Sequence, residues 1–223
     1  MTPPDMVSPD FPLHWQSSVW RDEFSRAIHT MSARVIVHNA DDRHDCLEFQ
    51  SALTSFLHLA MGVMRAERGN VQLVDPTDGA LRIVVQHGFA RPFLEFFRLV
   101  KNDKSACSAA LSAARPIVIA DVRTSPEYTD STRKVMLLAD AVACLSFPLI
   151  AGTQSVIGMI STHFAAPYRP TRAQIRRMTV IADNAVSVIL TYNFSGVAAA
   201  SHPSRLIEDL HDQSQPKTRI IDG

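Results

Sequence analysis

The sequence predicts an α+β domain built on one central antiparallel sheet of about six strands. The run Ala143–Phe164, ACLSFPLIAGTQSVIGMISTHF, has two apolar arms around a short polar segment containing Gly152, as in a β-hairpin with a four-residue connection. Both arms are apolar on both faces, so we expect the hairpin to lie centrally, with helices covering each side of the sheet. Two long amphipathic segments, 42–65 and 171–192, flank the remaining strand signals.

The composition is that of an ordinary globular protein. The chain has 223 residues, 46% of them apolar, and 22 basic residues balance 22 acidic ones, which does not favour nucleic-acid binding. No apolar run approaches the roughly 18 residues of a membrane span. The first residues, MTPPDMVSPD, lack the features of a signal peptide. Three widely spaced cysteines are typical of reduced thiols, so we expect a cytoplasmic protein that binds neither nucleic acid nor membranes.

The chain is expected to have three parts: an N-terminal extension over 1–40, a domain over 41–195 and a flexible tail over 196–223. The extension contains one apolar stripe with helical spacing, formed by Trp20, Phe24, Ile28 and Met31. We expect this helix to pack on the domain or on a second subunit. The tail lacks apolar periodicity, which favours a mobile segment.

The first half of the domain alternates between helix and strand signals. An apolar stripe predicts a helix over 42–65, with Gly69 as its left-handed terminator. Alternation predicts strands over 70–74 and 81–86, separated by the turn-rich segment DPTDG. A short aromatic-rich helix is expected over 93–99.

The second half adds the short elements that are expected to cover one face of the sheet. They are a helix over 105–114, a strand over 117–120, a loop over 123–130 (RTSPEYTD) and a helix over 132–141. Thr171 is expected to cap the last long helix. We expect the two long helices to pack side by side on one sheet face. The short helices and the loop then cover the other face, where a small-molecule pocket would form.

Small polar residues interrupt the apolar arms of the hairpin. Alternation places Cys144 and Ser146 on one face of the first arm, and Ser161 and His163 on one face of the second. Polar atoms on a buried face need a partner, a water or a ligand. We expect the two serines to face the same way and a polar or anionic small molecule to satisfy them. Asp121 and the amides at the start of the second short helix would add contacts.

Four blocks of the chain resemble the GAF domain, the small-molecule sensor module common in bacterial signalling proteins. They are GNVQLVDPTDGALRIVVQHGF, SACSAALSAARPIVIADV, CLSFPLIAGTQSVIGMISTHF and RPTRAQIRRMTVIADNAVSVI. The resemblance covers about Asp42 to Tyr192. It implies a GAF-like fold, with six antiparallel strands, a ligand pocket on one face and dimerisation through the outer helices. The resemblance does not identify the ligand or cofactor, because related domains hold cyclic nucleotides, bilins, haem, iron or small metabolites, and some hold nothing.

Two subtypes of this family place a cysteine where Cys107 falls. Bilin-binding relatives often follow theirs with a histidine, whereas Ser108 follows here. Free-methionine-sulfoxide reductases carry further cysteines, but 84–103 and 123–130 contain none, so a sulfenic acid on Cys107 would lack a resolving partner. The Asn-Lys…Phe…Asp-Glu series of cyclic-nucleotide-binding relatives is missing as well. We therefore expect no enzymatic activity and count Cys107 among the ligand-binding candidates.

Nitric-oxide-responsive activators are a third subtype, in which a GAF domain binds a mononuclear iron through a cysteine and carboxylates. Their cysteine precedes the same Pro-Leu strand as Cys144, and one carboxylate lies near the place of His163. Asp121 or Asp130 could complete a set of ligands that suits iron. We place no matching arginine, and His163 replaces the carboxylate. The expectation is therefore no metal, with Cys144 a buried small hydrophobe and His163 a hydrogen-bonding pocket residue.

Together these features predict a stand-alone sensor protein that binds a small molecule beneath the 123–130 loop. Its signal would pass through the long helices to the second copy in a homodimer or to a separate signalling protein. The segment after Ser195 is too short for a kinase or cyclase. The alternatives are an iron-binding sensor of the type above and a dimeric interaction module that binds no ligand. In that module the helix Trp15–Met31 would be the docking element.

Overall fold

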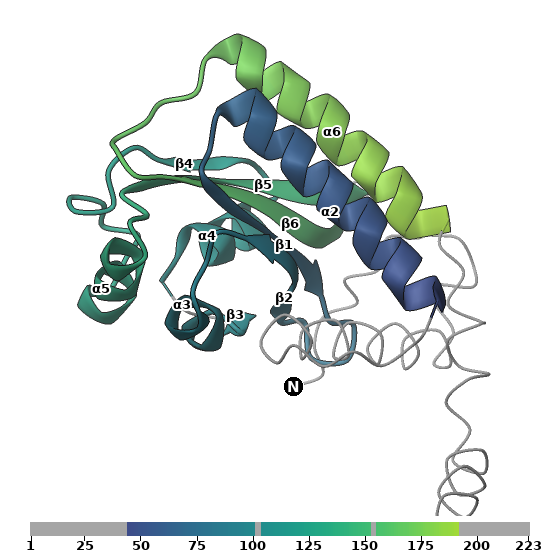
Figure 1. Cartoon of the computed structure of the whole chain (residues 1–223), viewed down its shortest axis with the longest axis horizontal. Coiled ribbons are helices and arrows are strands. Elements are labelled where there is room, and N and C mark those ends of the chain that lie inside the picture. Colours follow the sequence, from purple (N-terminus) through teal and green to yellow (C-terminus); the bar gives the residue numbers. More distant parts are fainter. Residues whose placement is uncertain (1–43, 101–103, 153–154, 192–223) are drawn as a thin grey trace, which may run out of the picture.

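The structure, a computed structural model, describes residues 44–100, 104–152 and 155–191. It contains one six-stranded antiparallel sheet with helices on both faces (Figure 1). The strand order is β3-β2-β1-β6-β5-β4, so the hairpin β5–β6 is central, as predicted. The expected N-terminal helix and C-terminal tail lie outside the described residues.

The described elements agree closely with the sequence prediction, with one exception. The helices are α2 (His44–Met64), α3 (Arg91–Phe96), α4 (Ala106–Ala113), α5 (Asp130–Leu138) and α6 (Arg172–Thr191). The strands are β1 (Arg68–Val74), β2 (Leu81–His87), β3 (Leu99–Val100), β4 (Ile117–Ile119), β5 (Ala143–Ala151) and β6 (Ser155–Phe164). The exception is β3. The predicted helix over 93–99 stops at Phe96, and the next residues instead pair with β2 at the sheet edge.

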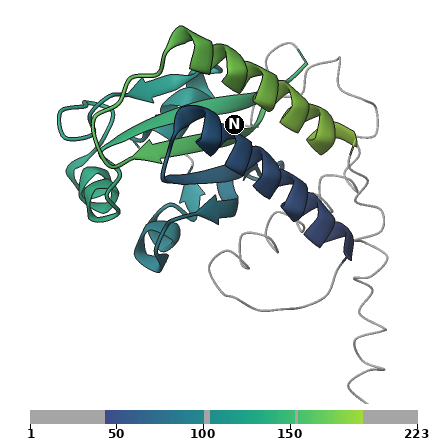
Figure 2. The ribbon, with the colours of Figure 1, turned by 45° about the horizontal axis from the view of Figure 1, so that its top comes forward.

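The two long helices pack side by side on one face of the sheet (Figures 1 and 2). At the start of α6, Thr171 Oγ1 accepts a hydrogen bond from the Gln174 N–H (3.2 Å), and Gln174 Oε1 accepts one from the Thr171 N–H (2.9 Å). Gln174 Nε2 also donates to the carbonyl of Val63 in α2 (3.0 Å). This reciprocal cap fixes the start of α6 beside the end of α2.

Gly69 does not end α2, which corrects the predicted terminator. The residue after the helix with a left-handed backbone is Arg65, with φ of 57°. Gly69 lies within β1 opposite Thr162. A Cβ there would be 2.8 Å from Leu57 Cδ1 and 2.9 Å from the Ser161 carbonyl oxygen. The glycine is therefore needed because it lacks a Cβ and lets α2 approach the sheet closely. It is not needed for a left-handed backbone conformation.

The other face of the sheet is covered by α3, α4, α5 and the loop 123–130, which we call the lid loop. Arg133 of α5 holds this loop, because its guanidinium donates to the backbone carbonyls of Val122, Ser125 (3.0 Å) and Tyr128 (3.1 Å). Tyr128 is thereby held with its side chain buried in the apolar layer beneath these elements.

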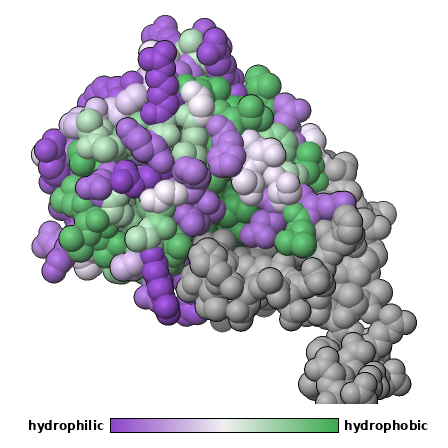
Figure 3. All heavy atoms as spheres, viewed as in Figure 1, coloured by the Kyte–Doolittle hydropathy of each residue, from purple (hydrophilic) through white to green (hydrophobic). Residues whose placement is uncertain are grey.

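The outer surface of the described part mixes polar and apolar side chains on the face shown in Figure 3. None of the helices among the described residues is long and apolar enough to cross a membrane. Three apolar side chains on the long helices are well exposed: Leu47 and Leu59 of α2 and Val180 of α6, at 46%, 57% and 60%.

Candidate functional site

Polar side chains from three central strands meet beneath the lid loop and short helices. Ser146 of β5 lies opposite Ser161 of β6, which lies opposite Asn70 of β1. The two serine hydroxyl oxygens are 3.1 Å apart, and both residues are fully buried. The prediction that the two serines face the same way is confirmed.

Cys107 of α4 lies over this serine pair. Its Sγ is 3.4 Å from the hydroxyl oxygens of both Ser146 and Ser161. The sequence placed Cys107 near the pocket, and the structure brings it into contact with two other predicted site residues. The serine hydroxyls therefore have partners within the protein, whereas the sequence led us to expect that they would need a ligand.

Cys144 and His163 form the next pair along the same two strands. Cys144 Sγ lies 3.1 Å from the Tyr128 hydroxyl, so the lid loop reaches the floor of the site. Burial raises the pKa of Cys144 to about 12, although the Tyr128 hydrogen bond opposes the shift. Burial also raises the pKa of Tyr128 well above its usual value. Both groups are therefore neutral at physiological pH.

His163 is buried among aromatic rings. Its imidazole meets Phe89 and Phe93 edge to face, with ring centroids 4.9 and 5.8 Å apart. Burial, with a smaller contribution from the positive charge of Arg68, lowers the pKa of His163 to about 3. Neither Nδ1 nor Nε2 has a hydrogen-bond partner. The neutral ring thus offers one donor and one acceptor to a bound molecule.

Asn70 and Gln72 of β1 are site residues that the sequence analysis did not select. They are 3% and 1% exposed, and Asn70 Oδ1 and Gln72 Oε1 have no hydrogen-bond partner. Their alternation with Val71 and Leu73 identified the strand, but alternation alone does not say which face is covered. The central position of β1, next to β6, turns these amides into buried groups.

A small closed cavity lies between these side chains. Its volume is about 20 Å³, roughly the space of one water molecule. The residues of the central strands form its floor, and Cys107 of α4 also lines it. The floor residues are Asn70, Gln72, Cys144, Ser146 and His163. Its cover includes the side chains of Phe93, Phe97, Tyr128 and Met136.

Asp121 does not take its expected place at the pocket and is not among the residues that line the cavity. Its two carboxylate oxygens accept hydrogen bonds from Arg123 Nε and Nη2 at 2.9 and 2.6 Å, and Oδ1 also accepts from the Arg123 N–H. The side-chain hydrogen bond from Arg123 lowers the pKa of Asp121. Asp121 therefore caps the loop after β4 and is not part of the lining of this cavity.

Among the described residues, no three His, Cys, Asp or Glu side chains gather where they could hold a metal ion. Cys144 and His163 are paired across two strands, but Asp121 is bound to Arg123. Asp130 lies at a separate, open hollow. The ligand set considered for iron is therefore not assembled in this part of the chain.

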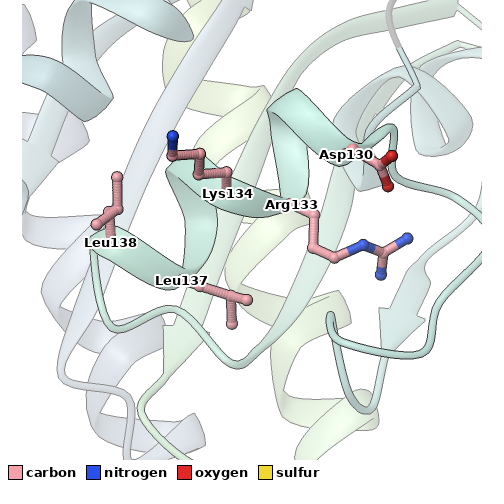
Figure 4. A pocket seen from close by; sticks show the side chains of 5 residues that line it. All are labelled: Asp130, Arg133, Lys134, Leu137 and Leu138. Atoms are coloured by element: carbon pink, nitrogen blue, oxygen red, sulfur yellow. The ribbon is translucent and has the colours of Figure 1, made fainter.

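The open hollow runs along the outside of α5 and has a volume of about 390 Å³ (Figure 4). It is lined by Asp130, Arg133, Lys134, Leu137 and Leu138. The guanidinium of Arg133 is occupied by the backbone carbonyls of the lid loop. The hollow presents no buried polar group, so we place the candidate site in the closed cavity.

Comparison with known proteins identifies the fold. No protein-family model matches the sequence, and no curated protein matches it. A GAF domain/HD domain protein from Geobacter sulfurreducens is 17% identical, with a TM-score of 0.53 over 63% of this chain and 91% of that one. The blue-light absorbing form of the Thermosynechococcus elongatus PixJ GAF domain is 13% identical, with a TM-score of 0.52 over 79% and 100%. A type II free methionine-R-sulfoxide reductase from Thermoplasma acidophilum is 12% identical, with a TM-score of 0.50 over 65% and 96%.

The chain therefore has a GAF-like fold, as the four sequence blocks implied. The similar structures include a blue-light absorbing GAF domain and a methionine sulfoxide reductase, at identities of 12–17%. Similarity at this level shows the fold alone, because one fold hosts many functions. The function must be argued from the site.

Proposed function

We propose that this chain is a sensor module that binds a small molecule in the closed cavity and signals through its long helices. One observation carries the proposal: four buried polar atoms without partners belong to three side chains that line one cavity. They are Asn70 Oδ1, Gln72 Oε1, and Nδ1 and Nε2 of His163. An unpaired buried polar group costs about 1–3 kcal/mol. A binding site retains such groups because a bound molecule satisfies them.

Binding of anything larger than a water requires the cover of the cavity to move. Tyr128 is the part of the cover that the lid loop supplies, and it is attached to the floor by its contact with Cys144. The loop itself is held by the hydrogen bonds from Arg133. We therefore expect the lid loop to open for entry and to close with Tyr128 against the bound molecule.

The route of the signal follows from the alternation of β1 and β6. Val71 lies between Asn70 and Gln72 but points to the opposite face, where it packs in the core under α2 and α6. A molecule that shifts β1 would therefore shift the packing of the long helices. The exposed apolar residues Leu47, Leu59 and Val180 on those helices support an output surface, either a homodimer interface or a separate signalling partner.

The same site gives little support to catalysis. Cys144 lies near Cys107, but a thiol with a pKa of about 12 supplies almost no thiolate at neutral pH. It is therefore a poor resolving partner for an oxidised Cys107, and we propose that the protein is not an enzyme. The three widely spaced cysteines of the sequence support a reducing, cytoplasmic location.

The second candidate function is an interaction module that binds no ligand. The small volume of the cavity, about 20 Å³, is the observation that favours it. The two candidates differ in what happens to the unpaired atoms. A sensor fills the cavity with a molecule that pairs them, whereas an interaction module keeps it closed and uses only the outer helices.

A thermal-shift screen of small polar metabolites on the full chain separates the two. For a compound that binds, we expect His163→Ala to weaken affinity by about 1–3 kcal/mol, or roughly 5- to 150-fold. Ser161→Ala should weaken it less, because the Ser161 hydroxyl is already paired with Ser146 and Cys107 and does not line the cavity. Thr162→Val is the matched control, because Thr162 lies between these residues and faces the long helices. It should leave the affinity unchanged. Failure of every compound to bind, or equal losses in all three variants, would favour the interaction module.

A further inference from the structure

We infer that the cavity selects a small uncharged molecule with at least two N–H or O–H donors, such as a carboxamide, a urea or a nitrogen heterocycle. This inference rests on the proposed function, since it names the class of molecule that the same cavity takes. It follows from the two unpaired acceptors on β1, the lack of charge around the cavity and its apolar cover.

The bound molecule should carry hydrogen-bond donors because two side chains of β1 offer unpaired acceptors. Asn70 Oδ1 and Gln72 Oε1 are unpaired acceptors on the same face of one strand, two residues apart. Two positions along a strand are separated by about 7 Å between Cα atoms. Each oxygen needs its own N–H or O–H donor, so the bound molecule should carry two such donor hydrogens, as a primary carboxamide does. His163 adds one donor and one acceptor because its ring is neutral.

The bound molecule should be uncharged because of the residues that line the cavity. No residue that lines the cavity in the described part of the chain is an Asp, Glu, Lys or Arg. The nearest basic residue along the floor is Arg68, the strand partner of His163, and its guanidinium binds the Asp140 carboxylate at 3.2 Å. A buried carboxylate or phosphate would lack a counter-charge, and a buried ammonium would lack a carboxylate. This narrows the polar or anionic ligand expected from the sequence to an uncharged one.

The residues that cover the cavity determine the size of the molecule and the character of its apolar part. Phe93 and Phe97, with ring centroids 4.6 Å apart, and Met136 form an apolar roof over the polar floor. A molecule with polar donors on one edge and a compact apolar remainder matches this arrangement. The volume of about 20 Å³ holds about one water, so a molecule of this kind enters only when Tyr128 moves out.

Three probes of nearly identical shape test the inference: acetamide, acetate and acetamidinium, which carry charges of 0, −1 and +1 at neutral pH. Each is titrated into the full-length protein and followed by amide chemical shifts. Concentrations reach about 100 mM, because probes of this size bind weakly. We expect acetamide to bind at least tenfold more tightly than either charged probe.

Gln72→Met removes one acceptor at nearly constant side-chain length. We expect it to weaken acetamide binding at least fivefold without lowering the melting temperature, because it also removes an unpaired buried oxygen. Thr162→Val is the control that should not change binding. Asn70→Leu repeats the test if Gln72→Met folds poorly.

Three results would overturn the inference. The first is acetate or acetamidinium binding as tightly as acetamide. That result would leave the proposed function standing, because the cavity would still bind a small molecule. The second is unchanged acetamide affinity in both Gln72→Met and Asn70→Leu. The third is no binding of any probe, and then the metabolite screen decides separately whether the proposed function also fails.

Discussion

The burial of His163 predicts that the protein loses stability as the pH falls through the mildly acidic range. Burial lowers the folded-state pKa from about 6.5 to about 3. Between these values the unfolded chain binds a proton that the folded protein does not, so stability is complete above pH 6.5 and declines toward pH 3. The slope inside this window is about 1.4 kcal/mol per pH unit. From pH 7 to pH 5, the loss due to this residue is about 2 kcal/mol.

Urea unfolding of the wild type and of His163→Asn at both pH values measures this contribution. Asparagine does not titrate, so the pH dependence of all other groups is shared by the two proteins and cancels in the comparison. We expect the free energy of unfolding of the wild type to fall by about 2 kcal/mol more than that of the variant. An equal fall in both proteins would refute the buried, neutral state of His163.

The following predictions concern other parts of the protein. Gly158→Ala should destabilise the protein by about 1–3 kcal/mol in urea unfolding, because its Cβ would lie 2.7 Å from a backbone carbonyl oxygen of β1. Gly62→Ala, where a Cβ meets nothing within 4 Å, should stabilise it by about 0.5–1 kcal/mol. A Gly158→Ala variant more stable than Gly62→Ala would contradict the close strand packing at Gly158. Arg133→Met should speed hydrogen exchange in 123–130 but not in β5, and unchanged exchange in the loop would show that Arg133 does not hold it. Light scattering at tens of micromolar should give a dimer mass, and a monomer mass would reject the homodimer. Free methionine sulfoxide should not be reduced, and a thiol-dependent turnover lost in Cys107→Ser would show that the protein is an enzyme.

The central hairpin could be predicted because both of its arms are apolar on both faces, a pattern that only a covered, central position explains. The period of two then placed Ser146 and Ser161 on one face, and the structure pairs their hydroxyls. The connection is one residue shorter than expected, since Ala151 still pairs with Ser155. The polar segment with Gly152 marks the turn in the sequence, but not the residue at which strand pairing stops.

The incorrect or missing predictions have a common cause, because each depends on how helices and strands pack against one another. In the sequence alone, Asn70 and Gln72 resemble the solvent-exposed face of an ordinary strand. Only the pairing of β1 with β6 shows that this face is buried. Gly69 resembled a helix terminator because its role, the close approach of α2 to the sheet, is a tertiary contact. The two-residue strand β3 carries no periodicity of its own and is defined only by its pairing with β2.

Native mass spectrometry of the freshly purified full-length protein tests the central claim of a small-molecule sensor most directly. The wild type and the Thr162→Val control should each carry the added mass of one small organic molecule per chain. His163→Ala, which removes two of the four unpaired atoms on residues that line the cavity, should lose that mass while remaining folded. A wild-type mass equal to that of the bare chain, or an adduct that survives in His163→Ala, would contradict the assignment of this cavity as the binding site.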